Sequence, residues 1–412
     1  MQFKNILTLL PFVIVAQAGP FAKRAECGHG RTAQHAQCCV WYDVLDDLQH
    51  NLFNEEPCGK NTHESLRLSF HDAVGFSPRL FAQGQFGGGG ADGSIIAHQD
   101  IEMKYDGNKG LKEIVERQTP IGPRHDVAYG DLYAPASSIF FSVEHSLPLY
   151  ISLEFNSLQL LVSHTARTYT FIIKAVNLTD TFGSKSGAPR LEFLAGRNKT
   201  SQAAPDLLPS PADSPDKLLD RLGDAGFSAD ELVDLLISHT IGGQEFVDPE
   251  VPHTPFDSTP ETFDTQFFVE TLLKGIHGKT NDTVPGEQPS PLKGEFRLAS
   301  DSALARDPRT SCRWQSNINN QQLMQTRFRN VMAKLAVTGH NRDDLVDCSE
   351  IIPVPKSLSK KAFLPAGKSL NDIEAACSAT PFPTLTAQPG PETSVHTEFL
   401  SISVLGPVET AA

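Results

Sequence analysis

The stretch RLSFHD, residues 67–72, decides the fold of this chain, because it places a cationic and an imidazole side chain on one face of a helix. The helical pattern begins at Asn61, a good N-cap residue with Glu64 three positions later, and continues through the stretch without Gly or Pro. Arg67 and His71 are four residues apart, a spacing that puts both on the same side of an α-helix. The sequence therefore predicts one helix face that offers both side chains to a common site.

A second helical pattern begins with a capping box at Ser228 and Glu231, carries a stripe of leucines and ends at Gly242. His239 falls on this stripe, so we expect its imidazole to face the interior. A lone histidine in an apolar stripe is usually only a hydrogen-bonded core residue. Two histidines that face one cavity favour a haem site instead, with His71 supplied by the first helix.

The composition is that of a globular protein with a large core. The chain has 412 residues, of which 39% are hydrophobic, enough for one large or two packed domains. Helical spacing recurs in 38–54 and 321–337 and strand alternation is scarce, so we predict an all-helical body. With 49 acidic and 35 basic residues, the chain offers no basic surface for a nucleic acid.

The first residues carry an export signal. Residues 1–18 combine a lysine, an apolar core and a small-x-small ending, which is typical of a signal peptide, and 19–24 form a propeptide that ends in a dibasic site. We therefore expect a secreted, extracellular protein with disulfide bonds, and with no membrane anchor because no later segment is apolar enough. Sequons at Asn198 and Asn281 predict glycosylation. Seven cysteines leave at least one thiol unpaired.

Two loops are rich in oxygen ligands. The stretch GGGGADGS (87–94) and the stretch DSTP (257–260) each offer carboxylate, hydroxyl and backbone carbonyl oxygens. Hard oxygen donors of this kind suit calcium. The alternative for either loop is a plain Asx or Ser turn. Because each loop follows one of the two histidines, we favour two calcium sites.

Together these motifs resemble the class II secreted haem peroxidases of fungi. The similarity covers nearly all of residues 25–395 except 132–186, and it looks closest to the generic, low-potential peroxidases of the ink-cap type. The matching segments are CCVWYDVLDDLQ (38–49), RLSFHDAVGFSP (67–78), GQFGGGGADGSIIAH (84–98), GAPRLEFLAGR (187–197), DAGFSADELVDLLISHT (224–240), PFDSTPETFDTQFF (255–268), SDSALARD (300–307) and CRWQS (312–316).

The resemblance implies an all-α haem-peroxidase fold in which two helical domains hold haem b between them. It divides the mature chain into a distal domain (25–131), a proximal domain (187–345) and an extended C-terminal tail (346–412). The stretch 132–186 replaces a short family helix with apolar, β-prone sequence. It is either a true insertion or translated non-coding sequence. We favour the second, because an insertion should not also delete a core helix and a disulfide cysteine, and we expect impaired folding or haem retention.

The resemblance also implies roles for single residues. His239 would ligate the haem iron, and Asp301 would hydrogen-bond the other nitrogen of its ring. On the opposite side, His71 would move a proton between the oxygens of hydrogen peroxide while Arg67 stabilises the developing charge. Asn108 would accept a hydrogen bond from His71 and keep its catalytic nitrogen basic. Small phenols or dyes would then be oxidised in one-electron steps through oxyferryl intermediates.

Further ligands follow from the same resemblance. Phe70 would pack over the haem. Two calcium ions would be held, the distal one by Asp72, Gly90, Asp92 and Ser94, and the proximal one by Thr240, Asp257, Thr259, Thr262 and Asp264. The disulfides implied are Cys27–Cys39, Cys38–Cys348 and Cys312–Cys377, with Cys58 left unpaired.

The reducing substrate depends on residues outside this common core. Manganese-oxidising relatives hold the metal with three carboxylates, where this chain has Lys60, Glu64 and Glu245. An ammonium repels a cation, so a standard manganese site is not expected. Lignin-type and versatile relatives carry a radical-forming tryptophan where this chain has Asp234. We therefore expect a generic peroxidase, a monomer whose partners are hydrogen peroxide and small aromatic reductants.

Two alternatives stay open at this point. One is a manganese-oxidising or lignin-modifying peroxidase with an altered site. The other is an inactive, calcium-binding glycoprotein of the same fold. The presence of Arg67, His71, Asn108, His239 and Asp301 together argues against a mere scaffold.

Overall fold

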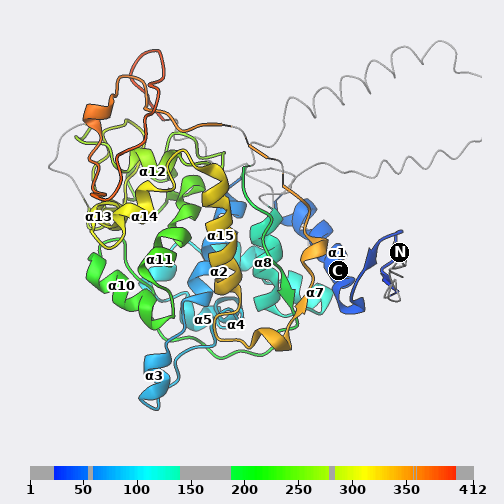
Figure 1. Cartoon of the computed structure of the whole chain (residues 1–412). Coiled ribbons are helices and arrows are strands. Elements are labelled where there is room, and N and C mark those ends of the chain that lie inside the picture. Colours follow the sequence, from blue (N-terminus) through cyan, green and yellow to red (C-terminus); the bar gives the residue numbers. More distant parts are fainter. Residues whose placement is uncertain are drawn as a thin grey trace, which may run out of the picture.

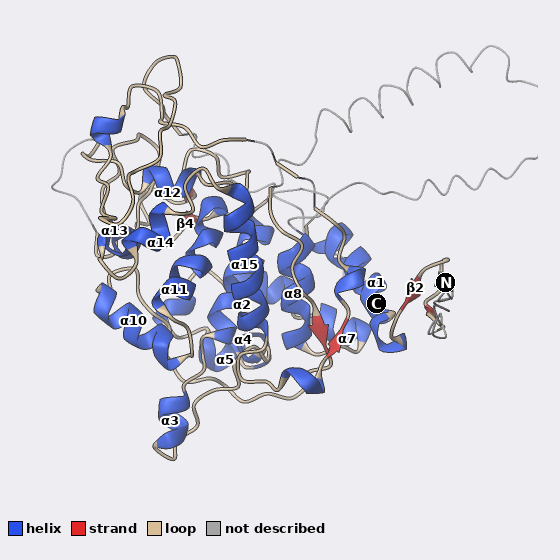
Figure 2. Ribbon diagram, in the orientation of Figure 1, coloured by secondary structure: helices blue, strands red, loops and turns tan. Residues whose placement is uncertain are grey.

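A computed structural model describes residues 23–53, 59–139, 187–277, 284–355, 357–358 and 360–395. This part of the chain is mostly helical, and its strands are three antiparallel pairs of two residues each (Figure 2). The pairs are β1 (Ala25–Glu26) with β2 (Thr32–Ala33), β3 (Leu194–Ala195) with β6 (Val346–Asp347), and β4 (Gly243–Gln244) with β5 (Thr254–Pro255). The predicted all-α class is confirmed.

The helices follow each other through loops that are often longer than the helices themselves. The first half contains η1 (Ala36–Cys38), α1 (Val40–Asp47), η2 (Leu48–Leu52), α2 (Lys60–Ala73), α3 (Pro78–Ala82), α4 (Ser94–Ala97), α5 (Gln99–Glu102), η3 (Asp106–Asn108), α6 (Lys112–Gln118), α7 (Ile121–His125) and α8 (Tyr129–Ile139). The second half contains α10 (Pro215–Asp224), α11 (Ala229–Leu235), η4 (Leu236–Ile241), α12 (Gln266–Glu270), α13 (Ala299–Arg306), α14 (Ser311–Gln315), α15 (Gln321–Ala336), η6 (Arg342–Asp344), η7 (Ser349–Ile351) and η8 (Leu370–Asp372).

Helix α2 lies at the centre of the molecule, beside α8 and α15 (Figure 1). Two hydrophobic clusters flank it, one built mainly from the first half around Trp41 and one mainly from the second half around Trp314. Leu68 of α2 belongs to the first cluster and Leu66 to the second. Because α2 contributes to both cores, its position is fixed from two sides. The boundaries of the two domains remain predictions.

Both histidine-bearing helices differ in detail from the sequence prediction. Helix α2 begins at Lys60 with Gly59 as N-cap, and Asn61 instead donates a side-chain hydrogen bond to the carbonyl of Leu52. Asn61 was therefore wrong as the cap, because its amide is used to bind the preceding segment. The capping box at Ser228 is confirmed. However, the α-helix ends at Leu235 and the chain continues as the tighter 3₁₀ helix η4, which carries the second histidine.

Helix α8 runs into the atypical stretch 132–186. Its residues Leu132, Tyr133 and Ala136 are buried in the first cluster, so the beginning of the stretch packs as helix. The remainder, 140–186, lies outside the described residues, as do the signal peptide, Cys58, Asn281 and the end of the tail. No helix in the described part of the chain is long and apolar enough to cross a membrane.

The structure contains the three disulfides that the resemblance implied, Cys27–Cys39, Cys38–Cys348 and Cys312–Cys377. The second joins the end of η1 to the N-cap of η7, and the third ties the tail to α14. The described part of the tail folds back on itself through the bridge Leu364–Ala387 and contacts the second half through the bridge Lys293–Ser394. These bonds restrict the segments around the helical body.

Candidate active site

His239 lies on η4 and is held by a buried carboxylate. Its Nδ1 donates to Asp301 Oδ2 at 2.8 Å, and Asp301, on α13, is only 1% exposed. The other carboxylate oxygen, Oδ1, has no hydrogen-bond partner. The imidazole packs against the rings of Phe256 and Phe267, with centroids 5.1 and 5.7 Å away. Because Nδ1 carries the proton, Nε2 keeps its lone pair, which fits an iron ligand with an anionic partner behind it.

His71, in the last turn of α2, is held in the same way by an amide. Its Nδ1 donates to Asn108 Oδ1 at 3.1 Å, and Asn108 Nδ2 donates to the carbonyl of Glu102 at 3.0 Å. This second bond fixes the orientation of the amide, so the imidazole keeps its lone pair on Nε2. Burial, aided by the positive charge of Arg67, holds the pKa of His71 well below its usual value. His71 is therefore a neutral base.

Arg67 lies one turn before His71 and is held by the same loop. Its Nη2 donates to the carbonyls of Gly107 and Lys109, at 3.1 and 3.0 Å. Phe70 packs against the core of the second half. On the same face of α2, His63 hydrogen-bonds the carbonyl of Ile241, two residues after His239.

This last hydrogen bond shows how the two helices are related. The face of α2 that carries His63, Arg67 and His71 is turned towards the segment of His239. Each side thus offers one imidazole whose Nδ1 is engaged and whose Nε2 is left as a base or ligand. This arrangement fits a haem between α2 and η4.

The predicted distal calcium residues gather around the buried carboxylate of Asp72. Its oxygens accept from the backbone N–H of Gly93 at 2.8 Å and from Ser94 Oγ at 3.4 Å. Gly90 turns the loop with φ of +79°. Burial, reinforced by the charge of Asp92, raises the pKa of Asp72 well above its usual value, and burial raises that of Asp92 to about 6. Two carboxyl groups that hinder each other's ionisation fit a bound divalent cation.

The predicted proximal calcium residues also lie together. Thr240 Oγ1 donates to Asp257 Oδ2 at 3.0 Å, and Thr259 Oγ1 donates to Asp264 Oδ1 at 3.1 Å. The backbone N–H of Thr262 donates to the carbonyl of Thr259, which closes the loop. Burial raises the pKa of Asp257 well above its usual value. Since Thr240 follows His239 directly, a cation here would brace the iron ligand.

Each calcium set has only two carboxylates, and its other members offer hydroxyl and carbonyl oxygens. Accordingly, within the described ranges no group of three or more His, Cys, Asp or Glu is arranged to hold a metal ion. Near the second set, Lys360 Nζ lies 3.4 Å from Asp264 Oδ2 and supplies a positive charge to it.

Lys60 occupies the place where manganese-oxidising relatives need a carboxylate, and it is surrounded by anions. Its Nζ lies 3.8 Å from Glu64, 3.2 Å from Glu113 and 3.6 Å from Glu245. Burial raises the pKa of Glu64 to about 8, and one oxygen of this carboxyl has no hydrogen-bond partner. The ammonium is therefore an internal cation among three carboxylates.

Asp234, at the position of the radical-forming tryptophan, is also committed to an ion pair. Arg313 donates to it with Nε at 2.9 Å and Nη2 at 2.5 Å, and the aspartate is buried. This pair joins α11 to α14. The position therefore serves packing between helices and offers no oxidisable ring.

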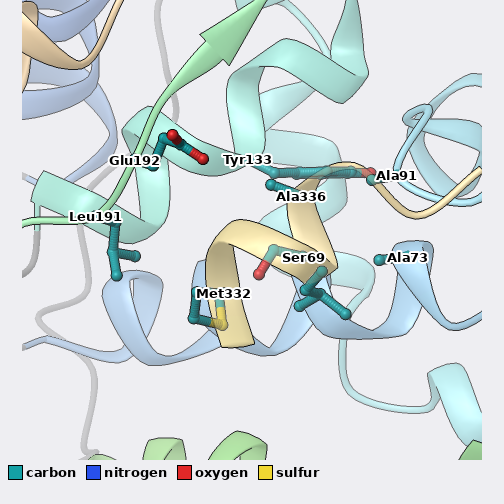
Figure 3. Close-up of a pocket in the computed structure, with 9 residues that line it drawn as sticks. Ser69, Ala73, Ala91, Tyr133, Leu191, Glu192, Met332 and Ala336 are labelled. Carbon is teal, nitrogen blue, oxygen red and sulfur yellow. The ribbon is translucent and has the colours of Figure 1, made fainter. Parts of the chain in front are cut away.

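A small cavity lies beside α2 (Figure 3). It has a volume of about 30 Å³ and lies between α2, α8 and α15, lined by Ser69, Ala73, Ala91, Tyr133, Leu191, Glu192, Met332, Leu335 and Ala336. The cavity has room for about one water molecule and its lining is mainly apolar, so we assign it no role in the predicted chemistry.

Three side chains near the site were missed at the sequence level. Glu113 joins the Lys60 cluster from α6, and His253 Nδ1 lies 2.7 Å from Glu245. Glu102 lies beside the distal carboxylates, and burial raises its pKa to about 7. Glu113 and Glu102 are brought in by contacts between segments far apart in the chain, for which the sequence carries no local signal, whereas His253 reaches Glu245 across the β4–β5 pair.

The helical fold and the two Nδ1-anchored histidines define the class of the protein as a haem peroxidase. Comparison of the whole chain agrees, since the peroxidase family model matches residues 44–320 and the fungal peroxidase extension region matches 323–398. The chain belongs to the peroxidase family, in its fungal class II branch.

The relatives come from several subtypes of this branch. The chain is 46% identical over 376 residues to a versatile peroxidase of Pleurotus eryngii, covering 90% of each protein. It is 43% identical over 398 residues to manganese peroxidase 3 of Phlebia radiata, covering 96% of this chain and 98% of that protein. It is 42% identical over 366 residues to a peroxidase of Arthromyces ramosus, covering 89% of each. Because the identities to the three subtypes are so similar, the subtype of this chain has to be inferred from particular residues.

The hydrogen bond between His71 and Asn108 predicts a partial loss of activity when the Asn108 side chain is removed. Asn108→Ala would leave the Nδ1–H of His71 without its acceptor, so we expect the second-order rate constant for reaction with hydrogen peroxide to fall by about 10- to 100-fold. Stopped-flow absorbance of the holoenzyme measures it. Lys109→Ala is the control, because only its backbone carbonyl holds Arg67, and a similar loss in this variant would contradict the role of Asn108.

Proposed function

We propose that this protein is a generic peroxidase, which reduces hydrogen peroxide and oxidises small phenols and dyes one electron at a time. The observation that carries the proposal is the pair of Nδ1-anchored imidazoles, His71 with Asn108 and His239 with Asp301. A histidine with a purely structural role in the core is expected to have both ring nitrogens hydrogen-bonded, whereas these two, on facing segments, use Nδ1 for a protein partner and keep Nε2 for chemistry.

Haem, when bound, supplies the redox-active iron at which the O–O bond is broken and oxidising equivalents are stored. His239 Nε2 would hold the iron. The carboxylate of Asp301 makes this imidazole a stronger donor by accepting its Nδ1–H. Phe256 and Phe267 pack against the ring and keep its orientation.

His71 acts as the acid and base. Its Nε2 takes a proton from one oxygen of hydrogen peroxide and returns it to the other, which leaves as water. The lowered pKa keeps the imidazole neutral, and so able to accept the proton, below the usual pKa of 6.5. The guanidinium of Arg67 stabilises the negative charge that develops on the leaving oxygen.

We infer that both oxygen-rich loops bind calcium. Paired, buried carboxylates support this, since each pair would be better stabilised by a divalent cation than by protonation. The sites adjoin His71 through Asp72 and His239 through Thr240. Calcium would therefore hold the ends of both histidine-bearing segments.

The choice of reductant rests on two positions. Lys60 supplies an ammonium among three carboxylates, and Asp234 supplies an ion-paired carboxylate instead of an indole. Neither favours oxidation of manganese or of bulky lignin units through a surface radical. The remaining candidates for the reductant are small aromatic molecules that reach the haem edge. The export signal and the disulfides support secretion, and we propose a monomer.

Replacing the proposed acid and base tests the function directly. In His71→Ala holoenzyme, kcat/KM for hydrogen peroxide should fall by about 100- to 10,000-fold in phenol oxidation assays, because no other group moves the proton. His125→Ala, on α7 and bound to Asp47, is the matched control. Phenol oxidation that survives intact in His71→Ala would refute the proposed mechanism.

The manganese position gives a second prediction. Lys60→Glu would bring a third carboxylate to Glu64 and Glu245, so we expect Mn(II) oxidation to rise at least about 10-fold over the unmodified enzyme. Lys60→Gln, which removes the charge without adding a ligand, should gain little. Substantial Mn(II) oxidation by the unmodified enzyme would instead favour an altered manganese peroxidase.

A further inference from the structure

Lys360 is a cation of the C-terminal tail that lies on a carboxylate of the proximal loop, residues 257–264. Its Nζ is 3.4 Å from Asp264 Oδ2, and the two side chains are 37% and 6% exposed. The proposed function assigns Asp264 to a calcium ion and gives Lys360 no role. An ammonium and a divalent cation are therefore both directed at one carboxylate.

The two oxygens of Asp264 have different partners. Oδ1 accepts from Thr259 Oγ1 at 3.1 Å and from the backbone N–H of Gln266 at 2.8 Å. Oδ2 faces the ammonium of Lys360. The hydrogen bonds to Oδ1 come from the loop and from α12, whereas the charge beside Oδ2 comes from a segment far along the chain. The tail thus supplies the positive charge for this carboxylate.

The tail segment that carries Lys360 is docked on the same loop. The side chain of Gln266 accepts from the backbone N–H of Phe363 at 3.2 Å and donates to the carbonyl of that residue at 3.0 Å. Leu364, the next residue, is 2% exposed and belongs to the hydrophobic cluster of the second half. The ammonium of Lys360 lies 5.3 Å from the centre of the Phe363 ring. These contacts set the reach of Lys360 towards Asp264.

Gln266 connects the docked tail to the carboxylate directly. Its backbone binds Asp264, and its side chain binds Phe363. A calcium ion held by Asp257 and Asp264 would lie close to the ammonium of Lys360. Whether calcium displaces the ammonium from Oδ2 or binds beside it, the two like charges oppose each other in this partly buried place.

We propose that Lys360 lowers the calcium affinity of the proximal loop by pairing with the Asp264 carboxylate. The inference rests on the calcium site of the proposed function, and it deepens that proposal by giving a residue of the tail control over the site. By thermodynamic linkage, calcium weakens the contact between Lys360 and Asp264 by the same factor. The docking of this part of the tail therefore responds to the calcium concentration.

Two other roles for Lys360 predict different results. If Lys360 orients Asp264 as a ligand, removal of the ammonium would weaken calcium binding. If it only holds the tail in place, calcium binding would not change. A general effect of net charge would appear equally at a neighbouring lysine. Lys361 is exposed and carries the same charge, so it is the matched control.

The test compares the holoproteins of the unmodified chain, Lys360→Gln, Lys360→Arg and Lys361→Gln. Competition for calcium with a fluorescent chelator, measured at equilibrium, gives the dissociation constants of the two sites without turnover. Asp257→Asn identifies the proximal component of the titration, and Asp92→Asn identifies the distal one. Each titration is repeated at low and at high ionic strength.

We expect Lys360→Gln to lower the proximal dissociation constant by about 3- to 10-fold and to leave the distal one unchanged. The difference should shrink at high ionic strength, because salt screens a partly exposed charge. Lys360→Arg and Lys361→Gln should bind calcium as the unmodified chain does.

An unchanged or raised proximal dissociation constant in Lys360→Gln, or an equal decrease in Lys361→Gln, would overturn the role of Lys360 alone. If the unmodified holoprotein shows no calcium component that Asp257→Asn removes, the proposed proximal calcium site is wrong and this inference is overturned with it.

Discussion

The hydrogen bond between His239 and the buried carboxylate of Asp301 is the constraint on which the rest of the site depends. Burying a carboxylate is costly unless it is paired, and one oxygen of Asp301 has no partner. The molecule tolerates this cost because the core holds α13 beside η4, with Phe267 against the imidazole ring. The pairing uses Nδ1, so Nε2 is the atom that we propose as the iron ligand.

The opposite side is organised by one short loop and one central helix. Helix α2 packs into both hydrophobic clusters, so the face with Arg67 and His71 has little freedom to turn. Residues 106–110 then fix both side chains by polar contacts, and Phe246 covers that loop from the second half. The disulfide between Cys38 and Cys348 ties the first half to the end of the second. The contacts that hold the two halves together therefore also fix the side chains of the distal site.

The sequence predicted the parts of this arrangement that rest on local periodicity. The helical face with Arg67 and His71 and the capping box at Ser228 needed only spacing and cap chemistry. The N-cap of α2 could not be predicted, because Asn61 has the right chemistry but is drawn to Leu52 by a tertiary contact. Glu113 was missed for the same reason, since its contact with Lys60 spans 53 residues. Disulfide pairing and calcium residues came from the family resemblance.

We propose that the two Nδ1-anchored histidines of this chain hold a haem between them. The optical spectrum of the secreted, full-length protein, recorded before and after addition of one equivalent of hydrogen peroxide, tests it most directly. We expect a Soret band corresponding to one haem per chain, which shifts on addition of peroxide and returns to its first position when a phenol is supplied. A secreted, folded protein with no Soret band, or with a band that peroxide leaves unchanged, would contradict it.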